Sequence, residues 1–153
     1  MHPVIPNTNS LSRGYSLVEL VIVMACAAIL LSAAVPNLYH LQQEWTLWGS
    51  AHLLVTSLQW GRMHAISANT SVTFRVDQNG RRFYWEDPVS GSMYKNTIRH
   101  LSNKVQITNS PRHALSFYQH GNAVPAGTFI LKGKTGLYRV VVNPGGRIRL
   151  QRH

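Results

Sequence analysis

Basic side chains near the C-terminal end of the sequence have the types and spacing that bind anions. The stretch Gly146-Arg147-Ile148-Arg149 is followed by Arg152. In an extended strand Arg147 and Arg149 share one face, because successive side chains point to opposite sides. A guanidinium group suits the oxygens of a phosphate, and glycine allows close approach to the backbone. The pattern therefore predicts a phosphate-binding surface that includes these residues.

A neighbouring stretch adds further cations to this surface. Residues 137–143 alternate in a way that places Arg139 opposite the expected core face. If Pro144–Gly146 closes a hairpin, the two strands bring their basic side chains to one exposed patch. That predicted patch consists of Arg139, Arg147 and Arg149, with Lys132 and Lys134 in the preceding loop. A bulge of one residue would change the grouping, and the arginines could instead solvate an edge strand.

Charge is distributed unevenly along the 153 residues. The chain has 15 Lys and Arg against 5 Asp and Glu, a formal net charge of +10. Every acidic residue lies at or before Asp87, and the chain from Pro88 onward carries only basic ones. Such a one-sided field attracts polyanions: nucleic acid, anionic lipid or polysaccharide. A charge that serves solubility alone is the simpler alternative.

The sequence gives little support for catalysis. It contains no G-x-S-x-G, no phosphate-binding P-loop and no Cys/His zinc spacing, so we expect neither an enzyme nor a cofactor. Its histidines lack metal-binding spacing and are His2, His40, His52, His64, His100, His113, His120 and His153. Those in the basic half would gain charge below about pH 6.5, which predicts tighter polyanion binding in acid.

One carboxylate, Glu19, interrupts an apolar run near the start of the chain. Residues 15–35 form a 21-residue stretch, about 31 Å long as a helix, which matches the hydrocarbon core of a bilayer. A carboxylate there costs about 2.5–3.5 kcal/mol and usually marks a function or a partner. A signal peptide would have a shorter run and a small-residue cleavage site. A core helix would need more surrounding core, and an ordinary anchor would leave Glu19 unexplained.

This block resembles the N-terminus of type IV pilins and of the pseudopilins of type II secretion. The matching features are Gly14, Glu19, the unbroken apolar stretch and Pro36, although the family usually has Phe where this chain has Tyr15. The resemblance implies that a prepilin peptidase cuts after Gly14 and that Tyr15 becomes the methylated N-terminus. It also implies that Glu19 pairs with the terminal amine of a neighbouring subunit. An opposite charge in a low dielectric would offset the cost of the buried carboxylate.

The rest of the chain resembles one branch of that family, the GspH/FimT-type minor pilins and pseudopilins. The resemblance lies in "QWGRMHAISAN" followed by "SVTFRV", in "LSFYQHGNAVPAGTFIL" and in "YRVVVNPGGRIRL". The single cysteine, Cys26, excludes the intramolecular disulfide of many major pilins, which favours a minor subunit. Gly-Arg-x-Arg near the C-terminus is the pattern of DNA-binding FimT-type minor pilins.

The resemblance implies a minor pilin that captures extracellular DNA non-specifically during natural transformation. Its partners would be DNA, other pilin subunits and the prepilin peptidase. The protein would cross the inner membrane once, with an extracytoplasmic C-terminal domain, before it enters the pilus. The competing interpretation is a GspH-like minor pseudopilin with a purely structural role in type II secretion, and a third is an adhesin for anionic glycans.

The elements that must position these residues form an α+β, pilin-like fold, a long N-terminal helix packed on antiparallel β-sheet. We expect a leader at 1–14, a hydrophobic transmembrane and assembly helix at 15–36, an amphipathic continuation at 37–70 and a β-rich domain at 71–153. The expected apolar stripe of the amphipathic part contains Leu38, Leu41, Trp45, Trp48, His52, Val55 and Leu58. Trp45 and Trp48 are expected to pack against the domain or another subunit, and His52 to be an interior histidine.

Period-two patterns predict the strands. Residues 71–77 and 81–87 flank Gln78-Asn79-Gly80, and Asn-Gly is a strong hairpin signal. Residues 88–97 are expected to form a loop. The later expected strands are Val105–Thr108, Leu115–Tyr118, Thr128–Leu131, Leu137–Asn143 and Arg147–Gln151.

Overall fold

A single helix, α1, runs from Leu17 to Ser67 and passes through Pro36 without ending. The computed structural model describes residues 16–152, apart from the side chains of residues 33 and 34. It forms two compact units, one up to Leu38 and one from Tyr39 on, here called the globular unit. Gly14 and Tyr15, the predicted cleavage site, lie outside the described residues.

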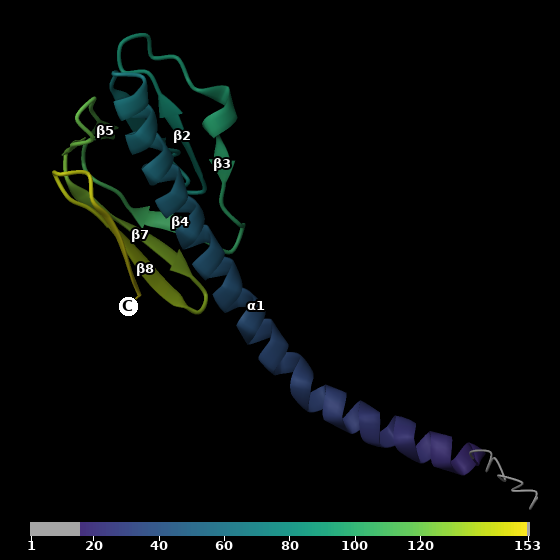
Figure 1. Ribbon diagram of the computed structural model, residues 1–153. Coiled ribbons are helices and arrows are strands. Elements are labelled where there is room, and N and C mark those ends of the chain that lie inside the picture. Colours follow the sequence, from purple (N-terminus) through teal and green to yellow (C-terminus); the bar gives the residue numbers. More distant parts are fainter. Residues whose placement is uncertain (1–15, 153) are drawn as a thin grey trace, which may run out of the picture. The chain divides into compact units, whose positions relative to one another are not determined.

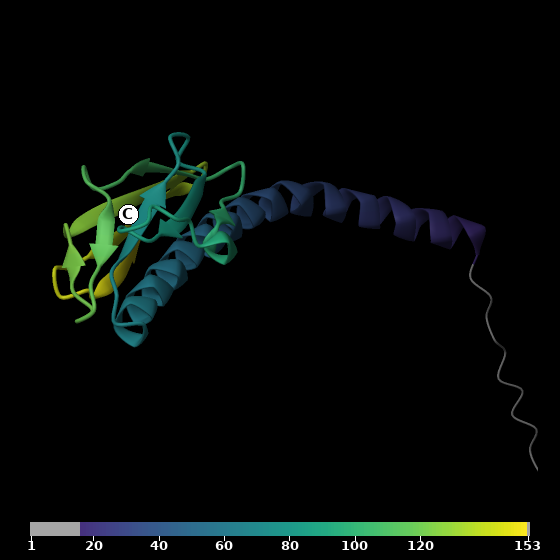
Figure 2. The ribbon, with the colours of Figure 1, turned by 90° about the horizontal axis from the view of Figure 1, so that it is seen from above.

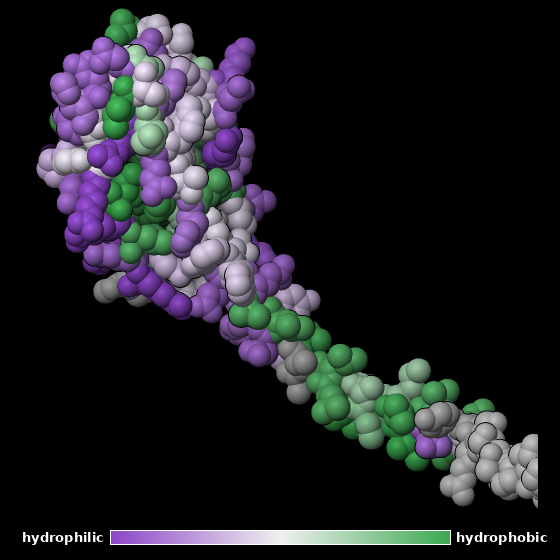
Figure 3. All heavy atoms as spheres, viewed as in Figure 1, coloured by the Kyte–Doolittle hydropathy of each residue, from purple (hydrophilic) through white to green (hydrophobic). Residues whose placement is uncertain are grey.

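The part of α1 up to Leu38 is apolar and exposed. By length and composition α1 can cross a membrane, and Figure 3 shows the apolar side chains of this part as a nearly continuous run of green. Cys26 is exposed here. Glu19 lies in the first turn of the helix, where the partial positive charge of the N-terminus favours a carboxylate.

The remainder of α1 supplies one wall of the core of the globular unit. Its buried residues recur at steps of three and four: Leu47, Ser50, Ala51, Leu54, Leu58, Gly61 and Ala65. In the first half of the expected stripe Trp45 and Trp48 are not buried against the domain, since they are 62% and 44% exposed. Their packing against another subunit stays a prediction. His52 is not interior either; it is half-buried, and its Nδ1 donates to the carbonyl oxygen of Trp48 over 3.1 Å. This stretch is apolar on two adjoining faces, and spacing alone does not reveal which one meets the sheet.

The strands form two antiparallel sheets. The five-stranded sheet has the order β3-β2-β1-β5-β6 and the four-stranded sheet the order β4-β7-β8-β9. The bounds of the first are β1 Val72–Val76, β2 Arg82–Glu86, β3 Arg99–His100, β5 Leu115–Phe117 and β6 Ala123–Val124. The bounds of the second are β4 Gln106–Asn109, β7 Gly127–Gly133, β8 Gly136–Val142 and β9 Ile148–Arg152. Figure 1 shows β2 and β3 on one side of α1 and β7 and β8 on the other.

The predicted α+β architecture and the hairpin at Gln78–Gly80 are confirmed. β1 pairs antiparallel with β2, and the amide of Gly80 donates to the carbonyl of Asp77 over 2.8 Å. Gly80 itself has a positive φ of 63°, which glycine adopts readily. Three short elements were not predicted: β3, β6 and a 3-10 helix, η1, at Lys95–Thr97 inside the expected loop.

The core lies between the two sheets and the C-terminal part of α1, which Figure 2 shows from above. Trp85, Phe83 and Phe117 of the first sheet are fully buried. Phe74 of β1 meets Phe129 of β7 with ring centroids 5.4 Å apart and an angle of 81° between the rings, an edge-to-face contact that joins the sheets. Among the residues whose side chains the structure describes, the buried hydrophobic ones all belong to the globular unit, so we expect residues 39–153 to fold without the preceding helix.

Candidate functional site

The register of β8 and β9 places Arg139 and Arg149 on one face of the four-stranded sheet. Arg139 pairs with Gln151 and Val141 pairs with Arg149, so the two arginines are diagonal neighbours about 7–8 Å apart. The residues that alternate with Arg139, such as Tyr138 and Val140, are buried in the core. The predicted hairpin and the predicted shared face of the two arginines are therefore confirmed.

Two further cations extend this surface. Lys132 pairs with Leu137, and Ile130 pairs with Arg139, so Lys132 is also a diagonal neighbour of Arg139 on the same face. Arg147 is exposed one residue before β9 and two positions from Arg149. We call Lys132, Arg139, Arg147 and Arg149 the basic face.

Arg139 is the unusual member of the basic face because its side chain is half-buried. Its Nε is buried and has no hydrogen-bond partner among the described residues. Half-buried Ile130, Leu137 and Val141 lie on the same sheet face. A buried guanidinium donor without an acceptor is costly.

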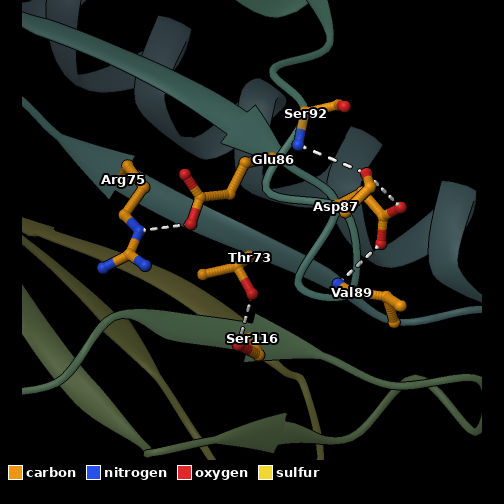
Figure 4. A network of polar contacts seen from close by, with 8 residues as sticks. Thr73, Arg75, Glu86, Asp87, Val89, Ser92 and Ser116 are labelled. Carbon is orange, nitrogen blue, oxygen red and sulfur yellow. Dashed lines mark hydrogen bonds and ion pairs between the residues drawn. The ribbon is translucent and has the colours of Figure 1, made fainter.

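Glu86 and Asp87 are engaged away from the basic face. On the five-stranded sheet Glu86 accepts from Nε of Arg75 over 2.6 Å, as Figure 4 shows. Asp87 accepts from the hydroxyl of Ser90 over 2.7 Å and from the amide of Val89 over 3.0 Å. These hydrogen bonds, that from Ser90 first, lower the pKa of Asp87. The carboxylates of Glu86 and Asp87 therefore do not lie on the sheet that carries the basic face.

Arg152 does not belong to the basic face, contrary to the prediction. It pairs with Tyr138 in the register, so it lies on the opposite side of the sheet, and Arg152 Nη2 is 2.5 Å from Glu44 Oε1. The reason is parity, since residues three apart in a strand point to opposite faces. The ion pair borders an open groove of about 490 Å³ whose other lining residues are Leu41, Trp45, Trp48 and Tyr138.

Gly146 supports the turn rather than a ligand. Its φ is 74°, and a Cβ there would lie 1.8 Å from the carbonyl oxygen of Gly121. That oxygen accepts from Nε of Arg62 on α1 over 3.1 Å, and the amide of Ala123 donates to the carbonyl of Pro144 over 2.8 Å. The group that lies close to Gly146 is thus the backbone of Gly121 and not a ligand. This contact holds the start of β9 and Arg147 in place.

Sequence reasoning missed Lys104 as a member of the site. It lies with Lys132 and Lys134 around a small pocket of about 200 Å³, which is completed by Asn103, Val105, Gln106 and Gly133. The pairing of Gln106 with Lys132 brings this segment beside β7. Lys104 is among the cations of the acid-free half, but only the β4–β7 pairing, which the sequence did not reveal, joins it to Lys132. Lys134 lies in the turn that connects β7 and β8.

No group of His, Cys, Asp and Glu suited to a metal ion occurs within residues 16–152. The guanidinium and ammonium groups of the basic face are side chains of the kind that bind the oxygens of an anion.

Two protein-family models match the chain. A family model described as type II transport protein GspH matches residues 50–146. A second, described as the prokaryotic N-terminal methylation motif, matches residues 9–35. No curated protein is significantly similar in sequence to the chain.

Solved structures share the fold. The type IV minor pilin FimU of Pseudomonas aeruginosa is 21% identical with a TM-score of 0.60, over 69% of this chain and 87% of that one. The minor pseudopilin EpsH from the type 2 secretion system of Vibrio cholerae is 18% identical with a TM-score of 0.57, over 69% of this chain and 96% of that one. The predicted pilin-like fold is therefore confirmed.

Proposed function

The chain belongs to the GspH family of type II transport proteins, and from that premise we propose that it is a minor type IV pilin that binds extracellular DNA. The role it shares with its family is that of a minor pilin or pseudopilin, a membrane-anchored component that contacts other pilin subunits in a fibre. The specific role that we propose for this chain is DNA capture during natural transformation, through the basic face.

The single observation that carries this proposal is the basic face itself. Four cations lie on or beside three adjacent strands with no carboxylate among them, and the Nε of Arg139 lacks an acceptor among the described residues. Their mutual repulsion is relieved when phosphates bind. Contacts to phosphates position a protein on DNA without reading its sequence, so the binding is non-specific. Lys104 and Lys134 extend the same surface.

Assembly uses the other end of the chain. We propose cleavage after Gly14 by a prepilin peptidase, methylation of Tyr15, and pairing of Glu19 with the amine of an adjacent subunit. The hydrophobic segment 15–36 would hold the subunit in the inner membrane before assembly, with the β-rich domain on the extracytoplasmic side. The exposed indoles of Trp45 and Trp48 supply apolar area for contacts within the fibre.

A DNA titration of residues 39–153 tests the proposal. Fluorescence anisotropy with a labelled duplex compares the wild type with Arg147→Ala/Arg149→Ala and with Arg152→Ala, a matched change on the opposite face of the same strand. We expect the double variant to lose at least tenfold in affinity and Arg152→Ala to bind like the wild type, each with an unchanged circular dichroism spectrum.

Two results would contradict the proposal: no binding at low salt, or equal binding by the wild type and the double variant. The function would then be the purely structural one of a type II secretion pseudopilin. A preference for an anionic polysaccharide over DNA in the same assay would indicate an adhesin.

A further inference from the structure

A second pocket, distinct from the basic face, lies where α1 approaches η1 and β3. Its volume is about 380 Å³, and its lining residues are Leu53, Thr56, Ser57, Trp60, Asn96, Thr97 and Arg99. In Figure 1, β3, which carries Arg99, lies on the same side of α1 as β2 and on the other side from β7 and β8. The pocket shares no residue with the basic face.

Trp60 forms an aromatic wall of this pocket that remains 41% exposed. Its ring is stacked on His64, with centroids 4.8 Å apart and an angle of 7° between the rings, and Tyr94 meets it edge-on at 6.4 Å. His64 lies one turn after Trp60 on α1, whereas Thr56 and Ser57 lie one turn before it, on the pocket side. Trp60 also lies beside buried Trp85, with ring centroids 6.3 Å apart, so neighbouring rings hold the indole while part of it stays exposed at the pocket. A fixed, partly exposed indole can stack on a planar ring.

Hydrogen bonds hold the opposite wall in place. The hydroxyl of Thr97 donates to the carbonyl of Tyr94 over 2.6 Å and accepts from the backbone amide of Trp85 over 3.1 Å, which ties η1 to β2. Nη1 of Arg99 donates to the carbonyls of Asn96 and Ile98 over 3.0 and 3.1 Å. The guanidinium is thus fixed at the rim of the pocket.

The charge of the rim identifies the class of ligand. Arg99 lines the pocket and is exposed, and no carboxylate lines the pocket. Lys95, which precedes the lining residue Asn96 in the chain, is exposed as well. A neutral sugar ring would leave the guanidinium of Arg99 without an anionic partner, whereas a phosphate would supply one. A nucleotide presents a planar base and a phosphate, which match the exposed part of the Trp60 indole and the guanidinium of Arg99.

We propose that this pocket binds one base of a single-stranded nucleic acid, stacked on Trp60, with Arg99 and Lys95 on the adjoining phosphates. In a duplex the bases are stacked on one another, so the pocket selects unpaired strands. The inference does not rest on binding by the basic face, which contacts phosphates and accepts duplex and single strand alike.

The test uses the full chain in a nonionic detergent and fluorescence anisotropy with two probes, a labelled 12-nucleotide oligothymidylate and a labelled duplex. The variants are Trp60→Ala, Trp60→Phe and Trp48→Ala, the last removing an equally exposed indole outside the pocket. We expect Trp60→Ala to weaken binding of the single strand about tenfold and to leave duplex binding unchanged. Trp60→Phe should retain most of the affinity, and Trp48→Ala should match the wild type.

The outcomes separate this inference from the proposed function. Arg147→Ala/Arg149→Ala, measured in parallel, reports on the basic face through the duplex probe. If the duplex fails to bind while the single strand binds in a Trp60-dependent way, the inference holds and the proposed duplex binding fails. Equal affinity of Trp60→Ala and the wild type for the single strand overturns the inference. So does an equal loss in Trp48→Ala, or an equal loss on both probes.

Discussion

Replacement of Gly146 by alanine should destabilise the globular unit far more than the same change at Gly145. Gly146 has a φ of 74° and lies against the carbonyl oxygen of Gly121, which a Cβ would approach to 1.8 Å, whereas a Cβ at Gly145 would meet nothing within 4 Å. A left-handed conformation costs a residue with a Cβ about 1–2 kcal/mol. The contact also pushes the turn at Pro144–Gly146 away from Gly121. This breaks hydrogen bonds such as that from the amide of Ala123 to the carbonyl of Pro144, each worth about 1 kcal/mol. The expected loss is about 2–4 kcal/mol in the free energy of unfolding.

Urea unfolding of residues 39–153, followed by circular dichroism, measures this loss directly. Gly146→Ala should lower the midpoint by about 1–2 M or more, since such domains lose about 1–3 kcal/mol per molar urea. Gly145→Ala should stay close to the wild type. If both variants unfold at the same urea concentration, the close packing of Gly146 against Gly121 is refuted.

Three further predictions concern the core and one loop. Ser57→Ala removes the acceptor, 3.1 Å away, of the indole N–H of buried Trp85 and should cost about 1–3 kcal/mol in urea unfolding; an unchanged midpoint would contradict this. Gly61→Ala places a Cβ 2.2 Å from the same ring, so we expect an altered near-ultraviolet circular dichroism signal and a loss of about 1–3 kcal/mol; an unchanged signal would show that the ring has room. The lowered pKa of Asp87 means that its stabilisation of the loop is complete above about pH 3.9 and is lost as the pH falls through the lowered pKa. The amide resonance of Val89 should shift in that acid range, and a shift complete above pH 5 would exclude Asp87 as its cause.

Local patterns predicted much of the fold. The Asn79-Gly80 pair marked a hairpin, and alternation along residues 137–143 placed Arg139 on the correct sheet face, because both signals depend on near neighbours in the chain. The same alternation separates Arg152 from Arg149, which lie three residues apart and therefore on opposite faces of the strand. Their predicted grouping followed nearness in sequence and not the sheet face.

Features that depend on distant pairing were not predictable in this way. The sequence does not state that β4 pairs with β7, so Lys104 was missed although it lies beside Lys132. The helix is apolar on two adjoining faces around Trp45 and Leu47, and only the position of the sheets decides which is buried. The role of Gly146 depends on Gly121, 25 positions away in the sequence, and no local pattern connects them.

The salt dependence of duplex binding tests the central claim, that the basic face contacts phosphates, most directly. Anisotropy titrations of residues 39–153 over a series of salt concentrations would compare the wild type with Arg149→Gln and Arg152→Gln. These variants remove the same charge from the same strand on opposite faces. Each lost phosphate contact reduces the slope of log K against log salt by about 0.9. The account predicts this reduction for Arg149→Gln and the wild-type slope for Arg152→Gln, and equal slopes for the two variants would contradict it.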